Sequence, residues 1–326
     1  KLLAQSISTF SYPALGALIM VLVFVGIPYT LLSSNASLIQ SLASTGKNDR
    51  SVYKLYAISN IGSFCGLLAY PFLIEPKLAI STQWLVFSIG ILLYTVMVGF
   101  LSLKKTVVES VEENTPVETS VPDTPTQTNS KVWLFLSALS CFLLNGISAH
   151  LCNDITPLPL MWAVMLALYL LSWTFGFTDR GSRLGPLTGL IAMVLAGFAA
   201  WHIQKVTGEG FYIELAIGCL LILFGGWTIH ARLYRLRPAE SQLTKYYLMI
   251  AVGGAIGGTA ASLVAPAIFS IVFEYPIALT LIFLPSLYEI FDWLVRMDDK
   301  TNGALNMPRH MDWKFPSFVL GVFFII

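Results

Sequence analysis

The chain contains 326 residues, of which 56% are hydrophobic and only 11% are charged, and its mean hydropathy is +0.73. A soluble domain usually has about 25% charged and about 45–50% apolar residues, so this composition excludes an ordinary soluble enzyme and a disordered or fibrous chain. The net charge of +1, without a basic stripe, argues against binding to nucleic acid. The remaining class is a helical protein with several membrane spans.

Nine apolar runs are long enough to cross a bilayer, which takes about 20 apolar residues in a helix. The runs are continuous and do not alternate between apolar and polar residues, so they predict helices and not the strands of a membrane barrel. The expected spans are 10–32, 52–74, 84–103, 132–150, 158–177, 184–203, 211–233, 246–273 and 276–294. A tenth span is expected to begin near Phe315.

Lysine and arginine residues gather on one side of these predicted spans. The loops after the odd-numbered spans hold 16 of them, whereas the opposite side holds only Lys1, Lys77 and Lys205. Because cytoplasmic loops carry the excess of basic residues in membrane proteins, the richer side is predicted to be cytoplasmic. Residue 1 then faces outward.

The segment 104–131 separates two groups of spans. It contains five acidic residues, three prolines and many threonines and serines, so it cannot bury a core and is predicted to be a disordered cytoplasmic linker. The expected organisation is a first half of three spans in residues 1–103 and a second half of six spans in residues 132–294. A cytoplasmic loop in 295–314 and the start of a further span in 315–326 follow. The uneven division suggests that three spans are missing from the front.

The second and eighth spans share a pattern of glycine and proline. The distance from Gly62 to Pro71 equals the distance from Gly257 to Pro266, and a glutamate follows each proline. These spans lie six spans apart, and six-helix repeats joined by a long cytoplasmic linker are the plan of major-facilitator transporters. The predicted fold is therefore an all-α membrane bundle of the major-facilitator type, with nine to ten spans in this chain and without the first three helices.

Several short motifs in a fixed order resemble the membrane region of bacterial spermidine-synthase-like proteins, which are often described as fused major-facilitator/spermidine-synthase proteins. The resemblance covers most of residues 14–285. It implies a multi-pass protein of the bacterial inner membrane, with helices before this region and often an aminopropyltransferase-type domain after it. The motifs are GIPY at 26–29, LSSNASLIQ at 32–40, LYAISNIGS at 55–63, YP at 70–71 with EP at 75–76, residues 154–160 with LALYL at 166–170, RP at 237–238 with LT at 243–244 and YL at 247–248, and the glycine pairs that precede AP at 265–266 and EYP at 274–276.

Polar residues in or near the spans are candidates for contact with a ligand. Acids on the predicted outward side face few lysines and would attract a cation, although the positive-inside bias alone also depletes that side of basic residues. Asparagines inside a span must find partners within the bundle, either another helix or a ligand. A histidine and an aspartate four residues apart share a helix face, which suits two roles, interfacial hydrogen bonding and a proton relay. The candidates are Asn60, Glu75, Asn145, His150, Asp154, Glu214 and Glu274.

Glycines spaced four residues apart in the second and eighth spans are predicted to let helix backbones approach closely. They are Gly62, Gly66, Gly253, Gly254, Gly257 and Gly258. The run at 253–258 lies within a long apolar stretch and so lacks the strand and amphipathic helix that a dinucleotide loop requires. The four cysteines have no metal-ligand spacing, and residues 1–326 contain no catalytic or nucleotide-binding motif. No catalytic residue, metal or other cofactor is therefore expected in this fragment.

Two functions remain open. The first is a transporter-like core that binds or moves a small polar or cationic, polyamine-like molecule between two six-helix halves. The second is a non-transporting membrane anchor or subunit, which serves an aminopropyltransferase-like domain or a larger membrane assembly. A hydrated cavity lined by Asn60, Asn145 and the outward acids favours transport, whereas a bundle centre filled with Leu, Phe and Gly favours the anchor.

The predicted orientation is tested by a protease-sensitive tag inserted at Thr115 in the linker. We expect the tag to be cleaved in inverted membrane vesicles and protected in spheroplasts, because the linker is predicted to face the cytoplasm. Cleavage in intact spheroplasts would reverse the orientation and remove the topological support for the repeat.

Overall fold

The computed structural model describes residues 13–27, 29–31, 39, 52–112, 130–155, 159–203, 210–239, 242–270, 273–301 and 308, and this part of the chain contains helices and turns but no strand. Four short π-helical turns, η1, η2, η3 and η5, follow α-helices directly. The elements are α2 (Pro13–Val21), η1 (Leu22–Gly26), α4 (Val52–Ala69), η2 (Tyr70–Ile74), α5 (Ile80–Glu112), α6 (Ser130–Ala149), η3 (His150–Ile155), α7 (Pro159–Gly176), α8 (Asp179–Arg183), α9 (Gly185–Ile203), α10 (Phe211–Arg235), α11 (Leu243–Thr259), η5 (Ala260–Val264), α12 (Ala265–Ile268), α13 (Glu274–Leu281) and α14 (Phe283–Lys300).

The helices match the predicted spans. Within the described residues, seven helical segments are long and apolar enough to cross a membrane, and each coincides with one predicted span. Two shorter apolar helices, Gly16–Leu31 and Leu160–Gly176, coincide with the other two. The protein is therefore an all-α membrane protein with several spans, as predicted. The tenth span, expected from Phe315, lies outside the described residues.

Two helices extend into segments that were predicted to be non-helical. Helix α5 continues through residues 104–112, which belong to the predicted linker, because this stretch contains neither proline nor glycine to end the helix. Helix α14 continues to Lys300, so the loop predicted to begin at 295 begins later. The rest of the linker, residues 113–129, lies outside the described residues.

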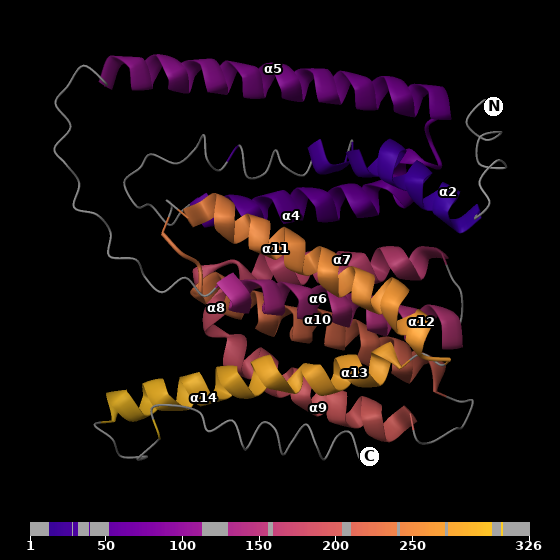
Figure 1. The fold of residues 1–326 in the computed structure, drawn as a ribbon, viewed down its shortest axis with the longest axis vertical. Helices are drawn as coiled ribbons and strands as arrows, with labels where there is room; N and C mark the ends of the chain where they lie inside the picture. Colours follow the sequence, from indigo (N-terminus) through magenta and orange to yellow (C-terminus); the bar gives the residue numbers. More distant parts are fainter. Residues whose placement is uncertain are drawn as a thin grey trace.

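The second half of the chain forms a bundle in which α10 occupies the centre (Figure 1). Helix α10 packs against α6, α7 and α9, while α11 lies along α6 and α14 lies along α9. Large apolar side chains fill the bundle interior between these helices. The fully buried ones include Leu143, Ile147, Met165, Leu221, Ile222 and Ile229.

The first half touches this bundle mainly through α4, which packs against α7. The ring of Tyr56 in α4 lies 5.1 Å from that of Trp173, 5.1 Å from that of Phe177 and 5.0 Å from that of Tyr247, measured between centroids. Helix α5 lies at the edge of the molecule, apart from the bundle (Figure 1). None of its apolar membrane-spanning window is buried, so its apolar side chains are available to lipid or to another membrane protein.

Helices α6 and α11 approach each other at glycines of α11. A Cβ atom added to Gly257 would overlap the backbone carbonyl of Ala138 in α6, and one added to Gly253 would overlap the carbonyl of Leu134. The Ser137 hydroxyl donates a hydrogen bond of 2.6 Å to the Ile250 carbonyl in the same contact. Small residues thus bring the two backbones together here.

Helices α4 and α11 share a local feature but not this packing. Each passes into a π-helical turn next to its proline, where the N–H of Glu75 donates to the Tyr70 carbonyl and that of Ala265 to the Ala260 carbonyl. In contrast, no described atom lies within 4 Å of a Cβ added to Gly62 or to Gly66. The packing role predicted for these two glycines therefore has no counterpart among the described residues.

This difference between the two glycine faces predicts unequal effects of the same substitution. Gly257→Ala is expected to destabilise the protein by about 1–3 kcal/mol, because the new methyl group meets the backbone of α6. Gly62→Ala has room for the methyl group and should leave stability unchanged or raise it by up to about 1 kcal/mol, because alanine is the better helix former. Thermal unfolding of the purified variants in detergent measures both, and equal melting temperatures would contradict the close contact between α6 and α11.

Candidate functional site

Two histidines surround one carboxylate beside the π-helical turn η3. Nε2 of His150 lies 3.8 Å from Oε2 of Glu214, and Nδ1 of His202 lies 3.2 Å from Oε1 of the same residue. The ring of His150 stacks on that of Tyr275, with centroids 4.1 Å apart and planes at 9°. We call His150, His202, Glu214 and Tyr275 the histidine–glutamate cluster. It begins at a π-helical turn, a feature that is frequent at functional sites.

The ends of two neighbouring helices place this cluster. His202 lies in the last turn of α9 and Glu214 in the first turn of α10. A carboxylate is favoured at a helix N-terminus and a protonated imidazole at a helix C-terminus, so both helix dipoles support the pair. Gly210, just before α10, leaves room for the imidazole, because a Cβ there would lie 2.6 Å from Cε1 of His202.

Glu274 lies next to this cluster, because it directly precedes Tyr275 at the start of α13. Its backbone packs on α6, where a Cβ at Gly146 would lie 2.9 Å from the Glu274 carbonyl oxygen. The residue is only 3% exposed, and Oε2 accepts no hydrogen bond from any residue that the structure describes. A buried carboxylate oxygen without a hydrogen-bond partner is costly, so this position suits a cation.

The two predicted asparagines bond within the protein. Nδ2 of Asn145 donates to the Cys141 carbonyl of its own helix at 2.8 Å, and Oδ1 accepts from the Ser262 hydroxyl of η5 at 3.2 Å. Nδ2 of Asn60 donates to the Tyr56 carbonyl at 2.8 Å. Asn145 therefore links two helices, in agreement with a role in helix association.

The structure thus brings together part of the predicted set. His150 and Glu214 are in contact, and Glu274 lies on the helix that stacks on His150. Glu75 is exposed beyond η2. Asn60 lies on α4, in the other half of the chain, and the side chain of Asp154 lies outside the described residues.

Sequence reasoning did not identify the contact between His202 and Glu214, and it gave Tyr275 no role. The sequence contains a signal for the contact between His202 and Glu214. His202 ends one span and Glu214 begins the next, so both must lie at the same membrane face.

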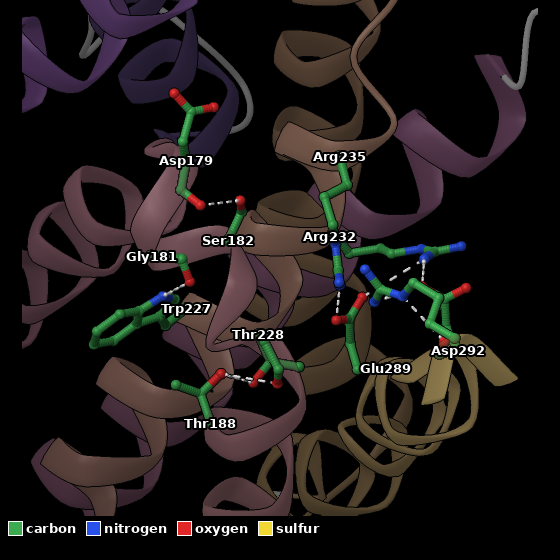
Figure 2. A network of polar contacts seen from close by, with 12 residues as sticks. Asp179, Gly181, Ser182, Thr188, Trp227, Thr228, Arg232, Arg235, Glu289 and Asp292 are labelled. Atoms are coloured by element: carbon green, nitrogen blue, oxygen red, sulfur yellow. Dashed lines mark hydrogen bonds and ion pairs between the residues drawn. The ribbon is translucent and has the colours of Figure 1, made fainter. Parts of the chain in front are cut away.

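A second polar cluster occupies the opposite end of α10 (Figure 2). Glu289 of α14 is fully buried and forms an ion pair with Nη2 of Arg235, while Nη1 of Arg232 lies 3.8 Å from Oε1 of Glu289. Oδ2 of Asp292 lies 3.3 Å from Arg232 and 3.0 Å from Arg296. We call these five residues the arginine cluster.

The arginine cluster combines an ion pair within α14 with an ion pair between helices. The sequence places Glu289, Asp292 and Arg296 on one helix face, which favours pairing within α14. Asp292 and Arg296 form an ion pair within α14, whereas Glu289 forms its ion pair with Arg235 of the neighbouring helix α10. Gly185 of α9 borders the same pair, and a Cβ at this position would collide with the Glu289 carboxylate.

Short helix α8 is held against α10 near the arginine cluster. The Thr178 hydroxyl caps α8 by accepting a hydrogen bond of 3.0 Å from the Gly181 N–H. From α10, the Trp227 indole donates to the Gly181 carbonyl at 3.0 Å (Figure 2), and the Tyr234 hydroxyl donates to Oδ1 of Asp179 at 2.8 Å. This end of the bundle is therefore fixed by polar bonds as well as by packing.

Comparisons with protein-family models, with curated proteins and with solved structures found no match for this chain. In the described part of the chain, no group of three or more His, Cys, Asp or Glu side chains is placed to hold a metal ion. The histidine–glutamate cluster with Glu274 and the arginine cluster therefore carry the inference about function.

The arginine cluster predicts a large difference between two carboxylates. Glu289→Gln is expected to destabilise the protein by about 3–5 kcal/mol, because it leaves the buried guanidinium of Arg235 without a counter-charge. Asp292→Asn should cost only about 0–1 kcal/mol, because Asp292 is 35% exposed and its ion pairs are screened. Thermal unfolding of both variants in the same detergent measures this difference in stability. A Glu289→Gln variant as stable as Asp292→Asn would contradict the buried pair.

Proposed function

We propose that this integral membrane protein has a transporter-like core that binds or moves a small polar or cationic molecule, of the polyamine type, at the end of the bundle formed by the histidine–glutamate cluster. The observation that carries the proposal is the carboxylate of Glu274, which is buried and whose Oε2 has no hydrogen-bond partner among the described residues. A cation supplies the missing charge.

The chemistry of the neighbouring groups favours an organic cation. Glu214 and Glu274 lie on different helices, α10 and α13, so a ligand with separated positive charges matches them better than a single ion. The stacked rings of His150 and Tyr275 add an aromatic surface beside the carboxylates, and aromatic faces attract ammonium groups. The described part of the chain lacks a set of donors for a metal ion.

We further propose that the bundle corresponds to the second half of a major-facilitator-like protein, as the resemblance to spermidine-synthase-like membrane regions implies. The shared π-helical turns beside the prolines of α4 and α11 support the repeat on which this proposal depends. The open face at Gly62 does not support it, since the equivalent Gly257 lies against α6.

The second candidate function is a non-transporting membrane anchor or subunit. Large apolar side chains fill most of the centre of the bundle between the two polar clusters, and the buried Ser172 and His230 there bond to each other. Helix α5 exposes apolar side chains along its whole spanning window, as a helix that contacts a membrane partner does. Both observations favour a structural role.

Binding of radiolabelled spermidine to the purified protein tests the first candidate. We expect Glu274→Gln and Glu214→Gln each to weaken binding by about tenfold or more, because a lost charge contact of this kind is worth about 1.4 kcal/mol or more. Glu75→Gln is the matched control, because Glu75 follows the equivalent proline but is exposed, and this variant should bind like the unmodified protein.

The outcomes separate the two candidates. Absence of spermidine binding by the unmodified protein would reject the polyamine class, and equal losses in all three variants would show a diffuse charge effect in place of a site. Binding that depends on Glu274 and Glu214, followed by uptake of spermidine into proteoliposomes, would establish transport. Binding without uptake would favour the subunit.

A further inference from the structure

A groove with a volume of about 440 Å³ opens beside the arginine cluster, between α6, α10 and α14. Val132 and Phe135 of α6 line one wall, Leu284 and Tyr288 of α14 line the other, and Arg232 of α10 is the charged residue of the lining. The volume lies within the range of ordinary small-molecule sites, which is about 300–1,000 Å³. This groove is at the other end of α10 from Glu214 and plays no part in the proposed cation site.

The charge at the groove is positive. The arginine cluster contains three guanidinium groups, those of Arg232, Arg235 and Arg296, and two carboxylates, those of Glu289 and Asp292 (Figure 2). The three guanidinium groups exceed the two carboxylates by one positive charge, which suits an anion.

The geometry of Arg232 makes its guanidinium the contact point for this anion. Its Cζ atom lies 4.2 Å from the centroid of the Tyr288 ring, so the aromatic wall of the groove orients the side chain. Asp292, its nearest carboxylate, is also bonded to Arg296 and keeps that partner when Arg232 turns to a ligand.

The groove lies near the ends of two membrane-spanning helices, α6 and α10. Helix α6 begins at Ser130 and α10 ends at Arg235, so the groove lies within a turn or two of the ends of both spans. Val132 is 39% exposed and Phe135 is 45% exposed, so the apolar wall continues onto the outer surface of the bundle, where acyl chains lie.

We propose that this groove binds an anionic phospholipid, with its phosphate on Arg232 and one acyl chain along Phe135 and Leu284. A guanidinium binds a phosphate through two parallel hydrogen bonds, and basic pockets between membrane helices bind acidic headgroups. A soluble anion leaves the apolar walls unused, and a neutral lipid leaves the surplus positive charge unused. Only an anionic amphiphile satisfies both parts of the groove.

Native mass spectrometry of the purified full chain, with phosphatidylglycerol and phosphatidylcholine of identical acyl chains, tests the proposal. The unmodified protein is expected to prefer phosphatidylglycerol by about fivefold or more, the effect of one basic residue near an anionic headgroup. Arg232→Gln should abolish this preference. Arg296→Gln is the matched control: it removes the same charge and also breaks a bond to Asp292, but Arg296 does not line the groove. The control should keep the preference.

A second variant tests the apolar part independently of the charge. Leu284→Trp adds bulk inside the groove and should weaken the binding of both lipids by about fivefold or more, whereas inorganic phosphate alone should not displace phosphatidylglycerol. The proposal is overturned if Arg232→Gln keeps the preference, if Arg296→Gln loses it equally, if Leu284→Trp binds both lipids normally, or if phosphate competes as a simple ion.

Melting temperatures of all variants show whether each is folded. If Arg232→Gln does not fold, Arg232→Lys, which keeps the charge but loses the planar fork, should lower the preference.

Discussion

Charged groups buried in an apolar bundle must find their partners within the protein, and this constraint shapes both ends of α10. In a bilayer no water is available to solvate an orphan group, so an unpaired charge costs several kcal/mol. At the end of α10, Arg235 meets the fully buried Glu289 of α14, and at its beginning Glu214 meets His150 and His202. Helices α6, α9 and α14 are therefore positioned against α10 by charge as well as by packing.

The two polar clusters lie far apart and are separated by apolar packing. Helix α10 has 25 residues and so spans about 37 Å. The middle of α10 packs against the helices that contain Leu143, Ile147 and Met165, and large aliphatic side chains fill this contact. Glycines of α10, such as Gly218 and Gly225, leave room for side chains of the neighbouring helices. The polar groups buried between the two clusters bond to each other, as Ser172 and His230 do at 3.0 Å.

Much of the fold could be predicted from sequence because membrane spans are defined by length and hydropathy alone. The nine predicted runs correspond to nine helical segments of the described chain. Partners across helices could not be predicted in this way, because periodicity shows which face a residue occupies but not which helix faces it. Glu289 illustrates this limit: it shares a face of α14 with Arg296, yet the structure pairs it with Arg235 of α10.

The two glutamates that follow the prolines, Glu75 and Glu274, show the same difference between what sequence and tertiary structure determine. In both α4 and α11 the helix passes into a π-helical turn next to the proline, which removes a backbone donor wherever it occurs in a helix. Whether the glutamate that follows is buried depends on the neighbouring helix. Glu274 lies against Gly146 of α6 and is enclosed, whereas Glu75 is exposed. Equal local patterns thus produced unequal environments.

The contrast between α11 and α5 explains why some helices join the bundle tightly and others do not. Lipid tails are as apolar as leucine, so hydrophobicity alone gives two membrane helices no reason to associate. Helix α11 supplies the two features that do, a glycine face against the α6 backbone and a hydrogen bond from Ser137 to its Ile250 carbonyl. Within the described residues, Gly90 and Gly99 of α5 have no neighbour within 4 Å, and the Thr95 hydroxyl bonds back to its own helix. Close backbone contact and interhelical hydrogen bonds, not apolar surface, therefore distinguish the packed second half from the helix at its edge.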